Sequence, residues 1–510
     1  MKALMRRLQA LPSVQDTTLP PIQFGEWTPD VPEISSSCPN LQDVIPFGPT
    51  GYKPMPDFAA VSTTALTARC QGAMPVFGAD RTTYKFAGDA TKLYGLEGAV
   101  WTDYSKGGGY TIASDEWWNF TKPPELDKIL ACHIDDPVQS VALGSTTFAD
   151  HFTSTLKPKA RYMTTVRDAF LMLANVDESG VQPTRVRWSA RGDSTDMDQS
   201  AANQSDAEDL DESYGWIQGI FGGEDATVFQ QNGITIGTYE GSPTIFRFDT
   251  RETARGLLAP KSAIRLGRNI YYLASDGFFR WDGGQSHNLS GGKINKTFFD
   301  DVEPTYYDRI CSAVDYPNQM VMWAYTNTAA TTATPNRILM YHWPSGWWAR
   351  AHISVDFLFS DALNYTTLEA LDNISSSIDA LEFSLDSRVW AGGANQVGAF
   401  NTSFQSGTFT GSNLAAIIDT GQRQHFHGRN GLVTGAIPLV DGGEPTIQVA
   451  GAIGLNDTFT FETAAAQTLA GKCPLRKKAR YHKYRLNVPA AATWTHATGI
   501  QPIVPQAGKR

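Results

Sequence analysis

The sequence predicts a mainly β protein, and three observations support this fold class. First, the 510-residue chain contains 45 glycines and 28 prolines, which favour turns and strands over helices. Second, no long stretch places apolar residues at the 3.6-residue spacing of an amphipathic helix. Third, short runs rich in β-branched and aromatic residues alternate with tight-turn signals along most of the chain. A chain of this length is expected to form two or three folded regions.

The clearest pair of β-runs lies in residues 267–283, which read GRNIYYLASDGFFRWDG. Residues 270–274 and 278–281 are rich in strand-forming residues, and a Ser-Asp-Gly turn at 275–277 joins them. Two β-runs around an Asp-Gly turn are the strongest short-range signal for a hairpin. One hairpin is marginally stable by itself, so this one is expected to pack with further strands.

Related hairpin patterns recur along the chain, at 84–96, 228–237, 338–350 and 381–393, with weaker ones at 111–120, 167–188 and 311–325. Their spacing is irregular, as in degenerate four-stranded units. We therefore predict a β-propeller over residues 61–410, with an array of β-sandwiches as the alternative.

Two of the hairpins have a turn with a Ser and an Asp ahead of a tryptophan, Ser-Asp-Gly at 275–277 and Ser-Leu-Asp at 384–386, and this pattern resembles the Asp-box turns of sialidase-type propellers. Such turns are structural: the Asp caps the turn and the Trp packs beneath it, so they mark the fold and not an active site. The residues predicted to form these structural turns are Ser275, Asp276, Gly277, Trp281, Ser384, Asp386 and Trp390.

The first sixty residues differ in composition from the rest, because ten prolines fall there. Proline fixes φ, removes a backbone donor and pushes the preceding residue to extended geometry. We predict an extended arm over residues 1–60 that lies on another surface. A disordered tail is the alternative, and apolar residues such as Phe24 and Trp27 argue against it.

The charge of the chain changes sign near its end. Residues 1–471 contain 33 basic and 52 acidic residues, a net charge of −19, whereas the whole chain carries −10. Residues 472–510 contain nine Lys or Arg and no acid. We predict a β-rich region over 411–510, in which alternation at 479–486 indicates a strand with one basic face. The basic cluster of this region comprises Arg476, Lys477, Lys478, Arg480, Lys483 and Arg485. Contact with another subunit is the preferred role for this cluster, and a nucleic-acid patch is the alternative.

The chain shows no signature of a catalytic, metal or cofactor site. Its five cysteines are scattered without a C-x-x-C pair, which predicts buried, reduced thiols in a cytosol-like compartment. No nucleophile elbow, phosphate-binding loop or zinc motif occurs, and no apolar run is long enough to span a membrane. We therefore expect no catalytic residues, no cofactor and no metal.

Across almost its whole length the chain resembles the tail nozzle or hub proteins of short-tailed bacteriophages, also called tail tubular or packaged-DNA-stabilising proteins. The resemblance is carried by turn-and-aromatic segments and by their order along the chain: 40–54, 86–94, 186–189, 241–246, 275–283, 341–348, 384–393 and 479–481. It implies a homo-hexameric ring in the virion tail, made in the host cytoplasm. The ring would extend the channel of the portal and head-tail adaptor, with fibres or spikes as further partners.

This resemblance also implies that viral double-stranded DNA passes through the ring. Tight phosphate contacts would slow the passage of DNA, so we expect an acidic lining that does not bind it. The run at 193–212 has eight acids and no base, as solvated acidic loops commonly do, and it is the candidate contributor. The acids expected to line the channel are Asp206, Glu208, Asp209, Asp211 and Glu212.

A second class of function is a glycan-binding or glycan-hydrolysing propeller of the sialidase kind, carried on a virion or secreted. It would share the hairpins described above. A glycosidase also needs two carboxylates facing one another across a cleft, and no such pair stands out among the 52 acidic residues.

Overall fold

The computed structural model describes residues 18–32, 37–48, 51–79, 82–125, 127–362, 395–454 and 456–505. The described chain is mainly β, as predicted. It contains thirty-nine strands and a single α-helix, α1 (Asn295–Asp301). Its short 3-10 helices include η3 (Glu212–Tyr214), η4 (Pro260–Ser262) and η5 (Pro304–Arg309).

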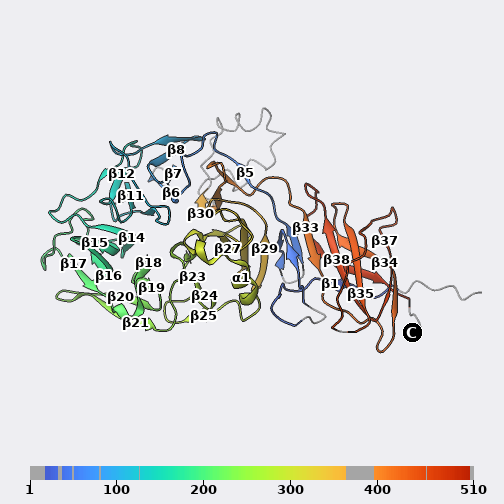
Figure 1. Cartoon of the computed structure of the whole chain (residues 1–510). Coiled ribbons are helices and arrows are strands. Elements are labelled where there is room, and N and C mark those ends of the chain that lie inside the picture. The colour runs from blue at the N-terminus through green and yellow to red at the C-terminus, as the bar shows by residue number, and fades with distance from the viewer. Residues whose placement is uncertain are drawn as a thin grey trace, which may run out of the picture.

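Seven four-stranded antiparallel sheets follow one another around a common axis and form a β-propeller (Figure 1). Blade 1 contains β6 (Gly72–Phe77), β7 (Thr83–Gly88), β8 (Leu93–Glu97) and β9 (Val100–Asp103). Blade 2 contains β10 (Asn119–Thr121), β11 (Lys128–Cys132), β12 (Gln139–Ala142) and β13 (Ala149–Asp150). Blade 3 contains β14 (Lys159–Val166), β15 (Phe170–Asp177), β16 (Val181–Trp188) and β17 (Asp206–Asp209).

The remaining blades continue the circle. Blade 4 contains β18 (Ile217–Phe221), β19 (Ala226–Gln230), β20 (Ile234–Gly241) and β21 (Ile245–Glu252). Blade 5 contains β22 (Ile264–Leu266), β23 (Asn269–Ala274), β24 (Gly277–Trp281) and β25 (Ser286–Asn288). Blade 6 contains β26 (Cys311–Asp315), β27 (Met320–Tyr325), β28 (Arg337–His342) and β29 (Trp347–Ala351). Blade 7 contains β30 (Phe357–Ala362), β31 (Asn395–Phe400), β32 (Ser406–Thr408) and β5 (Ala59–Ala60).

Blade 7 closes the propeller by combining strands from the two ends of the propeller sequence. Its outer strand β5 precedes blade 1 in sequence, and Ala60 and Ala59 pair with Gly407 and Thr408 of β32. Gly407 permits this pairing, because a Cβ there would lie 2.0 Å from the Ala59 carbonyl oxygen. The last blade therefore cannot be completed without the segment that comes before the first.

Face-to-face stacking of the blades explains why several strands are apolar on both faces. Every residue of β27 is buried, as are the first seven of β15, since each middle strand is covered by the blades on either side. Large aromatic side chains fill the space between blades, and the fully buried ones include Trp188, Trp281, Trp323 and Trp348.

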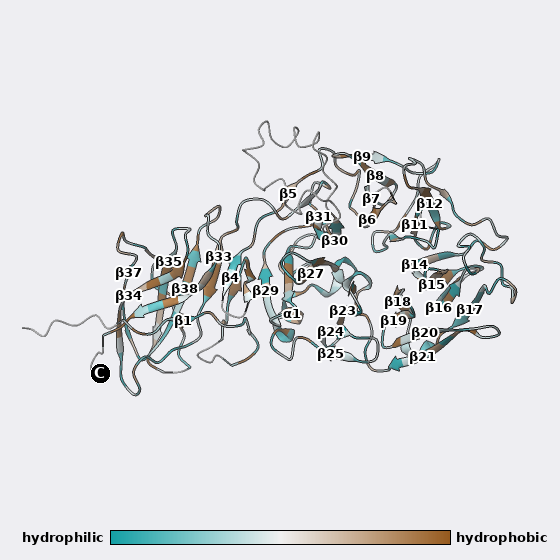
Figure 2. Ribbon diagram, turned by 180° about the vertical axis from the view of Figure 1, so that it is seen from behind, coloured by the Kyte–Doolittle hydropathy of each residue, from teal (hydrophilic) through white to brown (hydrophobic). Residues whose placement is uncertain are grey.

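The second body is a β-sandwich of two sheets. One sheet has the order β3 (Val44–Pro46), β4 (Tyr52–Pro54), β39 (Ala497–Ile503), β34 (Gly431–Val440) and β37 (Cys473–Ala479), and β1 (Ile22–Gln23) pairs with β39. The other has the order β2 (Leu41–Gln42), β33 (Ala416–Asp419), β38 (Tyr481–Val488), β35 (Thr446–Ala452) and β36 (Ala465–Ala466). Figure 2 shows hydrophilic and hydrophobic stretches alternating along these strands, as expected when one face of each sheet is buried.

The sandwich corrects the expectation of an extended arm at the start of the chain. Within residues 18–60, four strands belong to the sandwich and β5 belongs to blade 7. The prolines are accommodated because these strands are only two or three residues long. The propeller is thus an insertion in a sandwich that both ends of the chain build.

The same amino-terminal segment holds the two bodies together. Tyr52 packs against Trp347 of blade 6, with ring centroids 5.6 Å apart. Lys293 Nζ lies 2.8 Å from a carboxylate oxygen of Glu26, and the Asp43 carboxylate accepts a hydrogen bond from the backbone N–H of His352 at 2.6 Å. The hydrophobic core is continuous across this junction, so the sandwich and the propeller share one packed interface.

Most predicted hairpins are present where the structure describes them. Those at 84–96, 228–237, 270–281 and 338–350 correspond to β7–β8, β19–β20, β23–β24 and β28–β29. The weaker patterns at 167–188 and 311–325 correspond to β15–β16 and β26–β27. Residues 111–120 contain no hairpin, since only the start of β10 lies there. The hairpin predicted at 381–393 lies outside the described residues.

Candidate functional site

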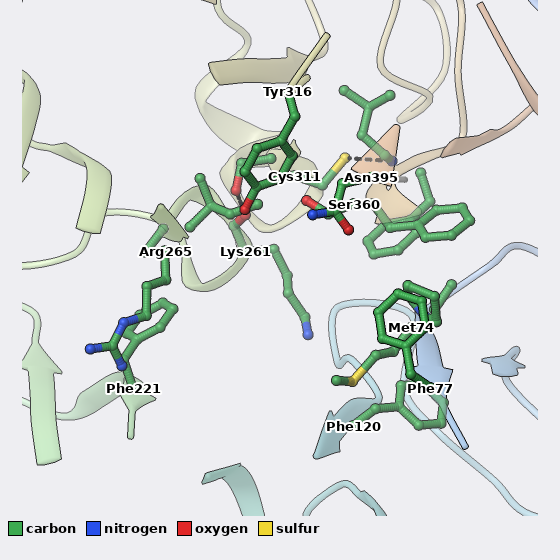
Figure 3. A pocket seen from close by; sticks show the side chains of 18 residues that line it. Met74, Phe77, Phe120, Phe221, Lys261, Arg265, Cys311, Tyr316, Ser360 and Asn395 are labelled. Carbon is green, nitrogen blue, oxygen red and sulfur yellow. Dashed lines mark hydrogen bonds between the residues drawn. The ribbon is translucent and has the colours of Figure 1, made fainter. Parts of the chain in front are cut away.

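Residues of η4 and of blades 1, 2, 4, 5, 6 and 7 line a cavity of about 490 Å³ near the propeller axis (Figure 3). Its wall is mostly apolar, and the aromatic side chains that line it come from four of the blades and the turn after β26: Phe77, Phe120, Phe221, Tyr316, Phe357 and Phe359. The cavity has the apolar lining and few polar groups that are typical of small-molecule sites.

Lys261 places its ammonium group in the middle of this cavity (Figure 3). The residue lies in η4, between blades 4 and 5, and its side chain reaches across the axis to blade 2. Its Nζ donates hydrogen bonds to the Trp118 carbonyl oxygen at 3.0 Å and to Asn119 Oδ1 at 2.8 Å. Burial lowers the pKa of Lys261 to about 8.

The backbone around Lys261 is held by side-chain hydrogen bonds from blade 6. Ser312 Oγ donates to the Lys261 carbonyl oxygen at 2.8 Å, and Trp323 Nε1 donates to the Ser262 carbonyl oxygen at 2.8 Å. Both donors belong to blade 6, so packing between blades positions the start of this side chain.

Arg265 is the second cation of the cavity, and its Nε donates to the Gly267 carbonyl oxygen at 3.0 Å. No Asp or Glu is among the described residues that line the cavity. It therefore presents positive charge and aromatic surface, and its described wall offers no carboxylate pair for glycoside hydrolysis.

The predicted basic cluster divides between two sheets. Arg476, Lys477 and Lys478 lie on β37, an edge strand of the sandwich, whereas Arg480 lies in the turn before β38. The predicted strand at 479–486 is present as β38, where buried residues alternate with half-buried ones that include Lys483 and Arg485. Among the residues of this strand, the basic ones are on the face away from the core.

Several of these cations already interact within the chain. Arg485 binds Asp419 through two hydrogen bonds of 2.7 and 2.8 Å, and Lys477 Nζ lies 2.5 Å from Glu462 Oε1. Lys483 lies over the ring of Phe459. Arg476 and Lys478 are exposed on β37, so they are the members best placed to meet another molecule.

The acids expected to line a channel lie at the outer edge of blade 3. Asp206, Glu208 and Asp209 belong to β17, the outermost strand of that blade, and Asp211 and Glu212 follow it at η3. Asp209 forms a bidentate pair with Arg185, whose hydrogen bonds are 2.7 and 2.8 Å long. These acids lie on the outermost strand of the blade or just after it, away from the propeller's own axis, and lining the channel of a ring remains a prediction for them.

The predicted structural turn at 275–277 is also present. Ser275 and Asp276 form the exposed turn between β23 and β24, Gly277 begins β24, and Trp281 is 1% exposed between blades. The Asp276 carboxylate pairs with Arg255 at 2.8 Å. Asp282 instead caps the next turn, accepting hydrogen bonds from the N–H groups of Gly284 and Gln285. The related residues Ser384, Asp386 and Trp390 lie outside the described residues.

Sequence reasoning missed Lys261 and Arg265. Each is a single cation in an unremarkable stretch, and no spacing links it to the aromatic residues of the other blades. The only local signal is Pro260, which begins η4 immediately before Lys261.

Comparisons with known proteins find only distant structural likenesses. No family model matches the chain, and no curated protein matches its sequence. Among solved structures, it is similar to the WD40 repeats of RRP9 at 10% identity and a TM-score of 0.37, over 60% of this chain and 88% of that one. It is also similar to the extracellular domain of the one-component system BT4673 from B. thetaiotaomicron at 9% identity and a TM-score of 0.39, over 82% of this chain and 48% of that one.

Two further features of the described residues concern membranes and metals. None of their helices is both long and apolar enough to cross a bilayer. No group of three or more His, Cys, Asp or Glu side chains in the described ranges is arranged to hold a metal ion.

Proposed function

We propose that this protein is a structural subunit of the tail of a short-tailed bacteriophage, a nozzle or hub that forms a sixfold ring below the portal and adaptor. In this role the ring retains packaged double-stranded DNA and conducts it at ejection. The proposal rests on the sequence resemblance over almost the whole chain and on one feature of the architecture.

That feature is the opposite charge of the two ends of the molecule. The exposed Arg476 and Lys478 lie on β37 at the far edge of the sandwich, and the exposed Glu208 and Asp209 lie on β17 at the far edge of blade 3. Figures 1 and 2 place these strands at opposite ends of the molecule. A basic end and an acidic end suit head-to-tail contact between copies, and a heterologous contact of this kind generates a ring when its rotation closes. Glu208 and Asp209 would then lie in the contact, and the channel prediction stands for Asp206, Asp211 and Glu212.

Both charged strands also have one unpaired side in the described sheets. An exposed edge strand carries free backbone N–H and C=O groups and is a template for pairing with another chain. Charge on such an edge directs the choice of partner, because opposite charges favour docking and like charges oppose it. The basic cluster is therefore assigned to a subunit contact.

The test is the oligomeric state of the purified protein, alone and mixed with a portal–adaptor complex. Negative-stain microscopy and mass photometry should show sixfold rings or a sixfold cap. Reversing the basic end with Arg476→Glu and Lys478→Glu should leave single subunits. The control carries Lys296→Glu and Arg251→Glu, which reverse two exposed cations of the propeller and should assemble normally.

A charge-swapped partner makes this test more specific. Copies carrying Glu208→Lys should assemble with copies carrying Arg476→Glu and Lys478→Glu when the two variants are mixed. Normal rings from the Arg476→Glu, Lys478→Glu variant would show that this contact is not the one used. Subunits that stay single even with the portal–adaptor complex would contradict the tail function itself.

A further inference from the structure

The central cavity has features that a purely structural propeller does not need. Two cations, Lys261 and Arg265, lie among aromatic side chains. Within the described residues neither has an acidic partner: the bonds of Lys261 go to Trp118 and Asn119, and that of Arg265 goes to Gly267. Arg265 is exposed to solvent and Lys261 is half-buried. The cost of an unpaired charge therefore falls on Lys261, whose ammonium lies against a largely apolar wall with no opposite charge beside it.

The titratable neighbours of Lys261 do not supply that opposite charge. Its electrostatic neighbours are the thiols of Cys70, Cys132 and Cys311. Burial raises the pKa of each of these thiols above its ordinary value, so they stay neutral near pH 7. The positive charge on the axis is therefore not compensated by the described side chains around it.

The ammonium group also has unused hydrogen-bonding capacity. A lysine ammonium has three N–H donors, and two of those of Lys261 are taken by the Trp118 and Asn119 oxygens. The third has no acceptor in the described part of the chain. In Figure 3 the ammonium lies in the open centre, with Met74 and Phe120 on one side and Arg265 and Phe221 on the other.

We propose that the cavity is a binding site for a small aromatic carboxylate, whose anionic group bonds the Lys261 ammonium and whose ring packs between Phe120, Phe221 and Phe359. A carboxylate matches the free donor and the uncompensated charge together, and a charge-assisted hydrogen bond is the strongest polar contact available there. An aromatic body matches the wall, because aromatic pairs are favoured beyond their buried area. The cavity volume of about 490 Å³ lies within the usual range for small-molecule sites.

This inference is independent of the proposed tail function, since it depends only on the interior of one propeller. It is tested on the full chain with 3-phenylpropionate as the probe and the neutral 3-phenylpropanamide as its matched control. Ligand-observed NMR at pH 7 should show saturable binding of the acid and binding at least tenfold weaker for the amide. The wild-type titration should also weaken progressively above about pH 8, where Lys261 loses its proton.

Two substitutions locate the site. Lys261→Met should remove binding of the acid, whereas Lys296→Met, at an exposed lysine of α1, should leave it unchanged. If Lys261→Met does not fold, the comparison of acid with amide and the pH titration decide the matter on the unmodified protein. Equal binding of acid and amide, no binding of the acid at millimolar concentration, or unchanged binding in a folded Lys261→Met variant would each overturn the proposal.

Discussion

At the scale of single residues, large aromatic side chains fill the space between blades. Trp281 illustrates this, since it lies with Phe229, Ile234 and Tyr272 in one apolar cluster between blades 4 and 5. Removing such a ring leaves a cavity whose walls relax only partly, and the lost contacts add to the lost transfer free energy.

The Trp281→Ala variant should therefore lose about 3–5 kcal/mol of its free energy of unfolding. Denaturant unfolding followed by circular dichroism measures this difference. Trp216→Ala is the control, because Trp216 is 55% exposed and its removal should be nearly neutral. Unchanged stability of Trp281→Ala would mean that the turn at 275–277 does not hold a packed repeat.

A second prediction at this scale concerns pH. Burial lowers the pKa of His482 to about 4 and that of His425 to about 3, and the two rings lie tilted against each other in the sandwich with their centroids 5.2 Å apart. In the unfolded chain a histidine titrates near 6.5. Between pH 6.5 and 4 the unfolded state takes up protons that the folded state does not, so stability is retained above 6.5 and falls as pH decreases.

Urea unfolding between pH 7.5 and 4.5 should show this loss, up to about 1.4 kcal/mol per pH unit for each histidine. The exposed His427 provides the control, since His427→Gln should leave the slope unchanged. His482→Met should reduce the slope if the variant folds. A stability that is flat across this range would contradict the buried neutral state of the pair.

At the scale of elements, closure of the propeller depends on β5, a strand of only two residues. Its position opposite Gly407 allows close approach, and any side chain at that position would meet the Ala59 carbonyl oxygen. Short strands from distant parts of a chain are held by such local fit, because two residue pairs add little hydrogen bonding of their own.

Gly407→Val should separate β5 from β32 and lower the free energy of unfolding by about 1–3 kcal/mol. Gly107→Val is a matched control, because a Cβ at Gly107 meets no atom within 4 Å. Thermal unfolding of the two variants measures the difference. If both variants were equally stable, the closure by β5 would contribute nothing to the fold.

Removing the first sixty residues is a related case. The sequence alone suggests that such a variant keeps its propeller and merely assembles poorly. The structure instead predicts loss of β5 from blade 7 and of four strands from the sandwich, so both bodies should be destabilised. A truncated protein with unchanged thermal stability would restore the interpretation of this segment as an arm.

At the scale of the whole molecule, charge distinguishes a conduit for DNA from a clamp. A protein that grips DNA neutralises phosphates with Lys and Arg, and its affinity falls steeply with salt. Here residues 1–471 carry a net charge of −19, and two of the cations of the basic cluster, Lys477 and Arg485, already pair with acids of the same chain.

We therefore expect weak binding to duplex DNA, with no submicromolar affinity at about 0.15 M salt. Fluorescence anisotropy of a labelled duplex over a series of salt concentrations measures this. A variant with Arg476, Lys477 and Lys478 neutralised should behave like the unmodified protein. Tight, salt-dependent binding that disappears in this variant would make the basic cluster a DNA clamp.

What the sequence determined by itself is the content of the repeats. Runs such as 270–281 encode strand, turn and strand within a dozen residues, because turn chemistry and side-chain alternation act between near neighbours. The mainly β class, the propeller and the basic strand β38 could therefore be predicted from local patterns. The acidic run was also visible, although its place on the edge strand of blade 3 was not.

What only the tertiary structure decided are the pairings between distant parts of the chain. β5 completes a blade with strands from the other end of the propeller, and β1 and β4 pair with β39 from the other end of the protein. In the same way, the hydrogen-bond acceptors of the Lys261 ammonium come from a distant blade, at Trp118 and Asn119 of blade 2. No local pattern records such partners, because their stability comes from burial and close approach, and these exist only once the seven blades have closed around the axis.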